Sequence, residues 1–172
     1  FDFDGEHYTV RGHDGQPTCI QSPHPPLIIG GGGRKVLTLA AREADIVGVN
    51  ANLQAGLINE EVGASATVEA TDEKLGWIRA AAGDRFDDVE LQTRVHMAQI
   101  TDDPLGLAEL MAPALGLDAE AALASPHVLV GSTGQCVETL LAWRERWGLT
   151  YIGLNEDAMV EFGPVVEALD GV

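Results

Sequence analysis

The stretch PLIIGGGGRKVLTLAAREADIVGVN, residues 26–50, contains the pattern that decides the fold. The short apolar run at 27–30 predicts a buried strand, because strands covered on both faces are apolar throughout. Residues 34–44 predict a helix, since their apolar side chains recur at helical spacing, and residues 45–50 predict a second buried strand. These elements form a β-α-β unit, whose two strands should be parallel neighbours.

The same alternation of strands and helices continues along the chain. Further strands are predicted at 89–100 and 150–155, and further helices at 71–83, 132–148 and 156–171. Thr71 is expected to cap the first of these helices and Gly83 to end it. We therefore expect an α/β fold in which four strands are each followed by helical sequence.

Other stretches are less regular. Residues 1–25 predict an irregular lead-in with one edge strand or hairpin arm, held extended by its prolines. Residues 103–117 and 118–125 have helical character that is interrupted by proline and glycine. The short apolar run at 127–131 predicts either a strand or a buried loop.

Composition limits the classes of function. The chain has 172 residues, of which 45% are hydrophobic, and this suits one globular domain. Lys plus Arg number 10 and Asp plus Glu 27, giving a formal net charge of −17. Because the chain is this acidic and has no basic cluster, it should repel the phosphates of nucleic acids. We therefore expect no nucleic-acid partner.

The expected location of the protein follows from its cysteines and its apolar runs. Cys19 and Cys136 lie far apart and no secretion signal is visible, which predicts reduced thiols in a cytoplasmic protein. No apolar stretch reaches the roughly 18 to 20 residues that span a bilayer, so we expect no membrane partner. The chain opens at Phe1 without an initiator methionine, so we expect it to continue a longer protein.

The glycine run at 30–33 stands between the first strand and its helix, where unpaired helical N–H groups attract anions. It departs from the P-loop, because Arg34, Lys35 and Val36 follow in place of Gly-Lys-Ser/Thr. It also departs from the dinucleotide fingerprint, and the second strand ends at Asn50 instead of an acidic residue. We favour a phosphate site, with a tight packing turn as the alternative.

Other reactive side chains do not form a recognisable site. The histidines have no spacing typical of metal ligands, so we expect no metal site. Cys136 lies inside a predicted helix and is interpreted as a small core residue. Trp77, Trp143 and Trp147 lie at packing positions of predicted helices, which favours core or interface roles over stacking on a flavin.

Several segments together resemble the luciferase-like monooxygenase family, and within it the members that use coenzyme F420. They are GEHYTV, the stretch at 26–50, LVGSTGQCVETLLAWRERWGLTYIGLNEDAM at 129–159, and FGPVVEAL at 162–169. The resemblance implies a (β/α)8 barrel, coenzyme F420 with FMN as the alternative, and a small organic substrate. It implies oxidoreductase or monooxygenase activity. It also implies that the cofactor phosphate binds at the glycine run, at Gly30, Gly31, Gly32, Gly33 and Arg34.

The resemblance covers only the C-terminal half of such a barrel, which takes about 250 residues or more. Residues 1–172 are therefore expected to be one incomplete domain whose missing N-terminal half is its natural partner. Alone, the chain should be inactive and should self-associate through its open sheet, as a homo-oligomer or an aggregate. Two alternatives stay open: a non-catalytic half-barrel that serves as a fragment or association module, and a Rossmann-like nucleotide-binding domain.

Further pocket residues are expected at the carboxyl ends of the strands, the catalytic face of such a barrel. Asn50, Asn155 and Glu156 stand there, although ordinary loop polarity would give the same pattern. Along 89–100 apolar and polar residues alternate, which should place Arg94 and His96 in the lumen. A solvent-facing strand would show the same alternation. Catalytic residues cannot be assigned from this half of the barrel.

Overall fold

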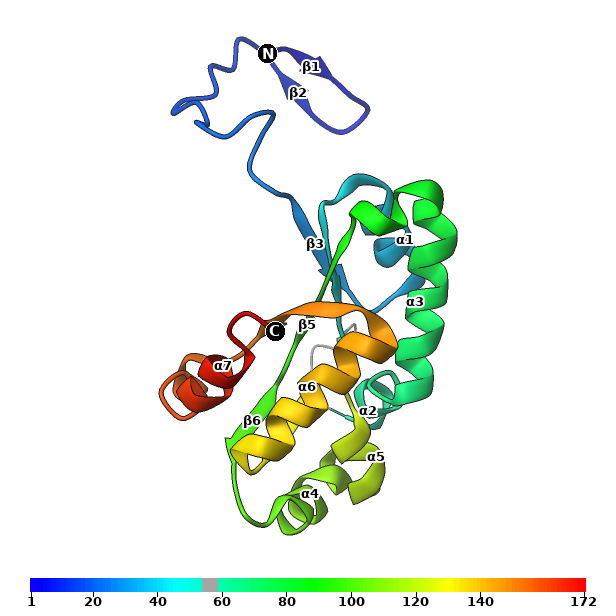
Figure 1. Ribbon diagram of the computed structural model, residues 1–172. Helices are drawn as coiled ribbons and strands as arrows, with labels where there is room; N and C mark the ends of the chain where they lie inside the picture. The colour runs from blue at the N-terminus through cyan, green and yellow to red at the C-terminus, as the bar shows by residue number, and fades with distance from the viewer. Residues whose placement is uncertain (54–58) are drawn as a thin grey trace.

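Four parallel strands form the central sheet of the computed structural model, which describes residues 1–53 and 59–172 (Figure 1). These are β3 (Ile28–Gly31), β4 (Ile46–Val49), β5 (Glu90–Arg94) and β8 (Leu149–Gly153). The strands lie side by side in chain order, β3-β4-β5-β8, without a reversal of direction along the sheet. The α/β class is confirmed, and the sheet is consistent with part of a (β/α)8 barrel. A Rossmann-like sheet has a point at which its strand order reverses, so this order argues against that alternative.

Helices α1 (Arg34–Glu43), α3 (Val68–Ala82) and α6 (Thr133–Trp147) share the main hydrophobic core with one face of the sheet. The strands contribute alternate side chains to this core, among them Val47, Leu91 and Leu149, as period-two alternation requires. Helices α3 and α6 are also joined by polar contacts, since Trp147 Nε1 donates to the Asp72 carboxylate over 2.7 Å.

The opposite face of the sheet carries exposed apolar side chains. Ile28 on the edge strand β3 is 53% exposed, and Tyr151 on the other edge strand β8 is 46% exposed. Glu90 and Arg94 of β5 are exposed as well, while their neighbours Leu91 and Thr93 are buried. In a closed barrel this open face would be the lumen.

The prediction of one long strand at 89–100 is wrong in one respect, because the structure divides this stretch into two strands. Strand β5 ends at Arg94, and β6 (Met97–Ile100) pairs in parallel with β7 (Val128–Gly131) in a separate two-stranded sheet. The backbone changes partners between consecutive residues: Val95 N donates to Gly153 O, and His96 N donates to His127 O, each over 2.9 Å. The alternative left open for 127–131 is thereby resolved as a strand.

The helix predicted at 71–83 begins earlier than expected. Helix α3 starts at Val68, and its N-cap is Thr67, whose hydroxyl accepts from Ala70 N. Thr71 instead lies inside the helix and donates its hydroxyl to Thr67 O over 2.8 Å. The predicted end is confirmed at Gly83, whose φ of 56° suits glycine.

The helix predicted at 132–148 has both of its expected ends. Ser132 and Gln135 form a reciprocal capping box at the N-terminus of α6, and Gly148 ends the helix with a φ of 73°. These local signals mark both ends of α6.

Shorter helices surround the carboxyl ends of the strands. They are α2 (Glu60–Ala64), α4 (Pro104–Met111), the 3-10 turn η2 (Ala112–Leu115) and α5 (Ala119–Ala124). The interruption expected within 103–125 is confirmed, since Gly116 turns the chain with a φ of 62°. After β8 come the 3-10 turn η3 (Glu156–Ala158) and α7 (Gly163–Leu169), which packs against α6.

The lead-in forms an antiparallel hairpin of β1 (Phe3–Asp4) and β2 (Thr9–Val10). Figure 1 shows the hairpin standing apart from the sheet, beyond the N-terminal end of β3. Another 3-10 turn, η1 (Gly83–Asp88), links α3 to β5. Within the described residues, no helix is long and apolar enough to cross a membrane.

Candidate functional site

The glycine run forms the turn between β3 and α1 at the carboxyl end of the sheet. Gly30 and Gly31 belong to β3, and Gly33 is the N-cap of α1. Among the described residues, no side chain caps the N-terminus of α1, so the first N–H groups of this helix have no side-chain partner. The exposed cations Arg34 and Lys35 follow directly.

Each glycine of the run has its own surroundings. A Cβ atom at Gly30 would lie 2.9 Å from Asn50 Nδ2, and one at Gly31 would lie 2.7 Å from Val36 Cγ1. At Gly32 it would lie 2.5 Å from the backbone of Ala51, whereas at Gly33 it would meet no heavy atom within 4 Å. Gly32 is thus explained by close packing on backbone, whereas Gly30 and Gly31 face side chains that would have to move. Gly33 leaves open space in front of the helix.

Asn50 lies beside this turn, directly after β4. Its amide nitrogen points toward the backbone of Gly30 and Gly48, and Gln92 Oε1 lies beside Gly48 on the same face. The Oδ1 atom of Asn50 is buried and has no hydrogen-bond partner among the described residues. This buried acceptor without a partner lies next to the glycine turn, and an N–H donor that reaches it would satisfy it.

Arg94 and Asn155 come together at the ends of neighbouring strands. Arg94 Nη2 donates to Asn155 Oδ1 over 2.9 Å, and both side chains are exposed. Arg94 lies on the face opposite the helical core, as predicted from its alternation with Leu91 and Val95, which are buried. Glu156 begins the turn η3 and is exposed. The structure therefore places Asn50, Arg94, Asn155 and Glu156 at the carboxyl ends of their strands.

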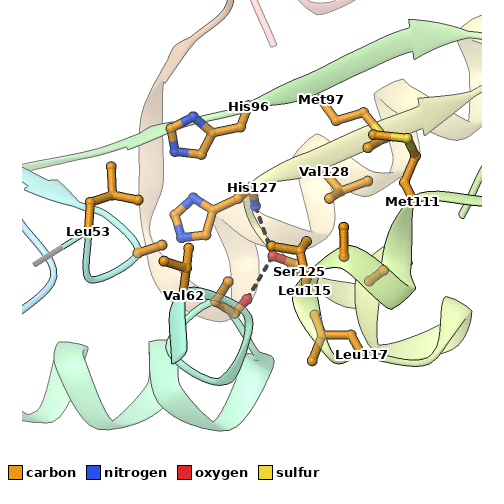
Figure 2. Close-up of a pocket in the computed structure, with 14 residues that line it drawn as sticks. Leu53, Val62, His96, Met97, Met111, Leu115, Leu117, Ser125, His127 and Val128 are labelled. Atoms are coloured by element: carbon orange, nitrogen blue, oxygen red, sulfur yellow. Dashed lines mark hydrogen bonds between the residues drawn. The ribbon is translucent and has the colours of Figure 1, made fainter. Parts of the chain in front are cut away.

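His96 has different surroundings from Arg94, contrary to the expectation that both lie in one lumen. Because the ladder breaks after Val95, His96 lies over a cavity of about 250 Å³ on the side of the short helices (Figure 2). Its ring centroid is 5.7 Å from that of His127. Partial burial, and secondarily the charge of Arg94, lowers the pKa of His96.

Two buried polar residues were not predicted from the sequence. Lys74 on α3 is only 2% exposed, and its Nζ donates to Asn50 O over 2.8 Å and to Ser65 O. Burial lowers the pKa of Lys74 to about 8. The signal was present, because Lys74 lies next to Leu75 and one helical turn before Ile78 on the apolar stripe of the helix.

The second unpredicted residue is His127, which is 4% exposed. Its Nδ1 lies 2.9 Å from Arg94 O, and its Nε2 is buried with no partner in the part of the chain that the structure describes. Burial lowers the pKa of His127 to about 4, although the hydrogen bond to Arg94 O opposes this effect. In the sequence, the only signal for the burial of His127 was its position next to a short apolar run.

Among the described residues, no group of three or more His, Cys, Asp or Glu side chains is placed to hold a metal ion. Cys136 is buried, and burial raises the pKa of its thiol. Trp143 and Trp147 are core residues, as predicted, and Trp77 packs against the same core.

Neither a family model nor a curated protein matches this chain. Solved structures do. A riboflavin lyase, solved with a modified FMN and riboflavin, matches with a TM-score of 0.64 over 99% of this chain at 14% identity. The coenzyme F420-dependent tetrahydromethanopterin reductase of Methanopyrus kandleri matches with a TM-score of 0.62 over 97% of this chain at 15% identity. This chain shares their fold.

The match is partial in one direction only. The chain spans 48% of the riboflavin lyase and 57% of the reductase, that is, about half the length of each. An F420-dependent secondary alcohol dehydrogenase, solved with an F420–acetone adduct, matches with a TM-score of 0.60 at 11% identity. This match covers 95% of this chain and 54% of the dehydrogenase. At such identities the likeness is one of fold.

Proposed function

We propose that this chain is the C-terminal part of a luciferase-like oxidoreductase that binds coenzyme F420, with FMN as the alternative. The observation that carries this proposal is the open, uncapped N-terminus of α1 at Gly33, within a fold shared with F420-dependent enzymes. A helix N-terminus that follows a glycine turn is suited to bind a phosphate through its backbone N–H groups.

The residues present fit such a cofactor. Gly33 leaves the approach to the helix N–H groups free, and Arg34 supplies a cation beside it in a chain of net charge −17. Asn50 Oδ1 would accept a hydrogen bond from a ring N–H, which would satisfy a buried acceptor. When bound, F420 would supply hydride transfer and FMN would support oxygen chemistry. The chain's own part is to anchor the phosphate, orient the ring and exclude water.

The open face of the sheet supports an incomplete domain. Ile28 and Tyr151 expose apolar surface at the two edges, where a closed barrel would continue. We infer that residues 1–172 are one part of a barrel and that the missing half covers this face. The second candidate is a non-catalytic half-barrel, in which the same exposed apolar face would serve for association alone.

Cofactor titration of the full-length protein distinguishes these functions. We expect F420 to bind, and FMN to bind more tightly than riboflavin, because the two flavins differ only in the phosphate that Gly33 and Arg34 would hold. Arg34→Met should reduce the difference between FMN and riboflavin, whereas Arg42→Met, on the same helix away from the turn, should leave it unchanged. A protein that binds none of the three molecules would support the non-catalytic half-barrel.

A further inference from the structure

A second potential binding site lies apart from the glycine turn. The cavity of about 250 Å³ lies where α2, η2 and α5 meet the beginnings of β6 and β7 (Figure 2). Its walls are mostly apolar and include Val62, Met97, Leu115 and Val128. Its polar lining residues are His96, Ser125 and His127.

The hydroxyl of Ser125 already donates one hydrogen bond and accepts another. It donates to Ala66 O over 2.7 Å and accepts from His127 N over 3.2 Å, as the dashed lines in Figure 2 show. It therefore has no donor left for a ligand, and its role is to hold His127 in place.

His127 has one ring nitrogen in use and one free. Its Nδ1 lies 2.9 Å from Arg94 O, and since a carbonyl oxygen can only accept, Nδ1 carries the proton. Nε2 is then an acceptor, and it is buried without a partner among the described residues. Burial keeps the ring neutral at ordinary pH, since the pKa of His127 is about 4.

Water is a poor occupant of this place. An ordered buried water needs two to four polar partners, whereas most residues that line the cavity are apolar and Ser125 has no donor left. His96 is more exposed than His127 and lies at the border of the cavity. A ligand that fills apolar volume and offers a single donor would match the cavity better than water does.

We propose that this cavity binds a small, neutral, largely apolar molecule with one hydrogen-bond donor, such as a phenol, an alcohol or an N–H heterocycle, whose donor bonds to His127 Nε2. The volume allows this, because apolar cavities of about 150 Å³ already bind benzene. A charged ligand is disfavoured, because no free counter-charge lines the cavity among the described residues.

The test compares two probes of nearly the same shape, indole and indene, of which only indole has an N–H donor. Calorimetric titration of the full-length protein without cofactor should show indole binding about tenfold more tightly than indene, the gain expected of one good hydrogen bond. Equal affinities, or no binding of either probe, would overturn the proposal. This comparison needs no variant and no cofactor, so its result is independent of the proposed function.

A pair of variants separates the acceptor from the cavity. His127→Asn keeps a donor near Arg94 O but has no atom at the Nε2 position, so indole and indene should bind alike. Leu115→Trp fills the cavity and should abolish binding of both probes. A preference for indole that survives in a folded His127→Asn protein would contradict the proposed role of Nε2.

Discussion

Gly32 lies so close to Ala51 that a Cβ atom at Gly32 would come within 2.5 Å of the Ala51 backbone. The neighbouring Gly33 has no such restriction, since a Cβ atom there would meet nothing within 4 Å. The glycine run therefore combines two requirements, close packing of the turn on the segment after β4 and free access to the N-terminus of α1. Substitutions at the two positions should fail in different ways.

Gly33→Val should weaken F420 binding about tenfold or more, because its side chain would occupy the approach to the helix N–H groups. Folding should be destabilised by about 0.5–2 kcal/mol, the range of an N-cap substitution. Gly32→Ala should instead destabilise the protein by about 1–3 kcal/mol through overpacking. Fluorescence titration and denaturant unfolding of both variants measure these effects, and a Gly33→Val protein with unchanged affinity would reduce the run to a packing turn.

Lys74 should make stability depend on pH in the alkaline range. Its pKa is lowered from 10.5 to about 8 in the folded protein, so between these values the unfolded chain binds a proton that the folded one does not. Stability contributed by this group is therefore constant below pH 8 and rises toward pH 10.5, by about 3 kcal/mol in total. The neutral amine still has two hydrogens for Asn50 O and Ser65 O.

Urea unfolding at pH 7.5 and pH 10 measures this rise. Lys74→Met should lose it, while Lys35→Met, at an exposed position of α1, should retain it. If the stability of the wild type and that of Lys74→Met changed equally between pH 7.5 and pH 10, the lowered pKa of Lys74 would be contradicted.

Arg85 closes the C-terminus of α1, whose C-cap is Ala44 instead of a glycine. Its guanidinium donates to Ala41 O over 2.5 Å and to Ala44 O over 2.8 Å. Arg85→Met should cost about 1–3 kcal/mol, because two helix-end carbonyls lose their partner. The stability of Arg85→Lys should lie between those of the wild type and Arg85→Met, since one ammonium group cannot reproduce the two hydrogen bonds of the planar guanidinium. Thermal unfolding ranks the three proteins, and equal midpoints would show that solvent replaces the cap.

The open face should cause the chain of 172 residues to self-associate when it is alone. Light scattering should give a mass above the 18.2 kDa of the monomer. Replacing Ile28 and Tyr151 by lysine should reduce association, because these exposed side chains lie at the two edges of the sheet. Val166→Lys, at an exposed position of α7, is the control. A monomer at all concentrations would contradict an incomplete barrel.

Local sequence signals predicted the regular elements well. The apolar run and helical stripe at 26–50 gave β3, α1 and β4, and the Ser132 cap with Gly148 gave α6. The break at Val95 was not predictable, because the alternation continues through it and only the change of partner from Gly153 to His127 reveals it. Such a change depends on contacts distant in sequence.

The candidate site was predicted in part for the same reason. Strand ends are visible in the sequence, so the positions of Asn50, Arg94 and Asn155 at the carboxyl edge of the sheet were predictable. Their role as pocket residues stays a prediction. The surroundings of Lys74 and His127 were not predictable, because burial of a polar side chain depends on elements that pack on it from elsewhere in the chain. The separate roles of Gly32 and Gly33 likewise depend on Ala51, which comes close to Gly32 only when β3 and β4 pair.

The central claim is that the cofactor phosphate binds at the N-terminus of α1. The most direct test is a crystal structure of the full-length protein with F420. We expect a phosphate oxygen at hydrogen-bond distance, about 3 Å, from a backbone nitrogen at Gly33 or Arg34. The ring should lie on the open face of the sheet near Asn50. A cofactor whose phosphate lies elsewhere, with the turn at Gly33 left free, would contradict the account.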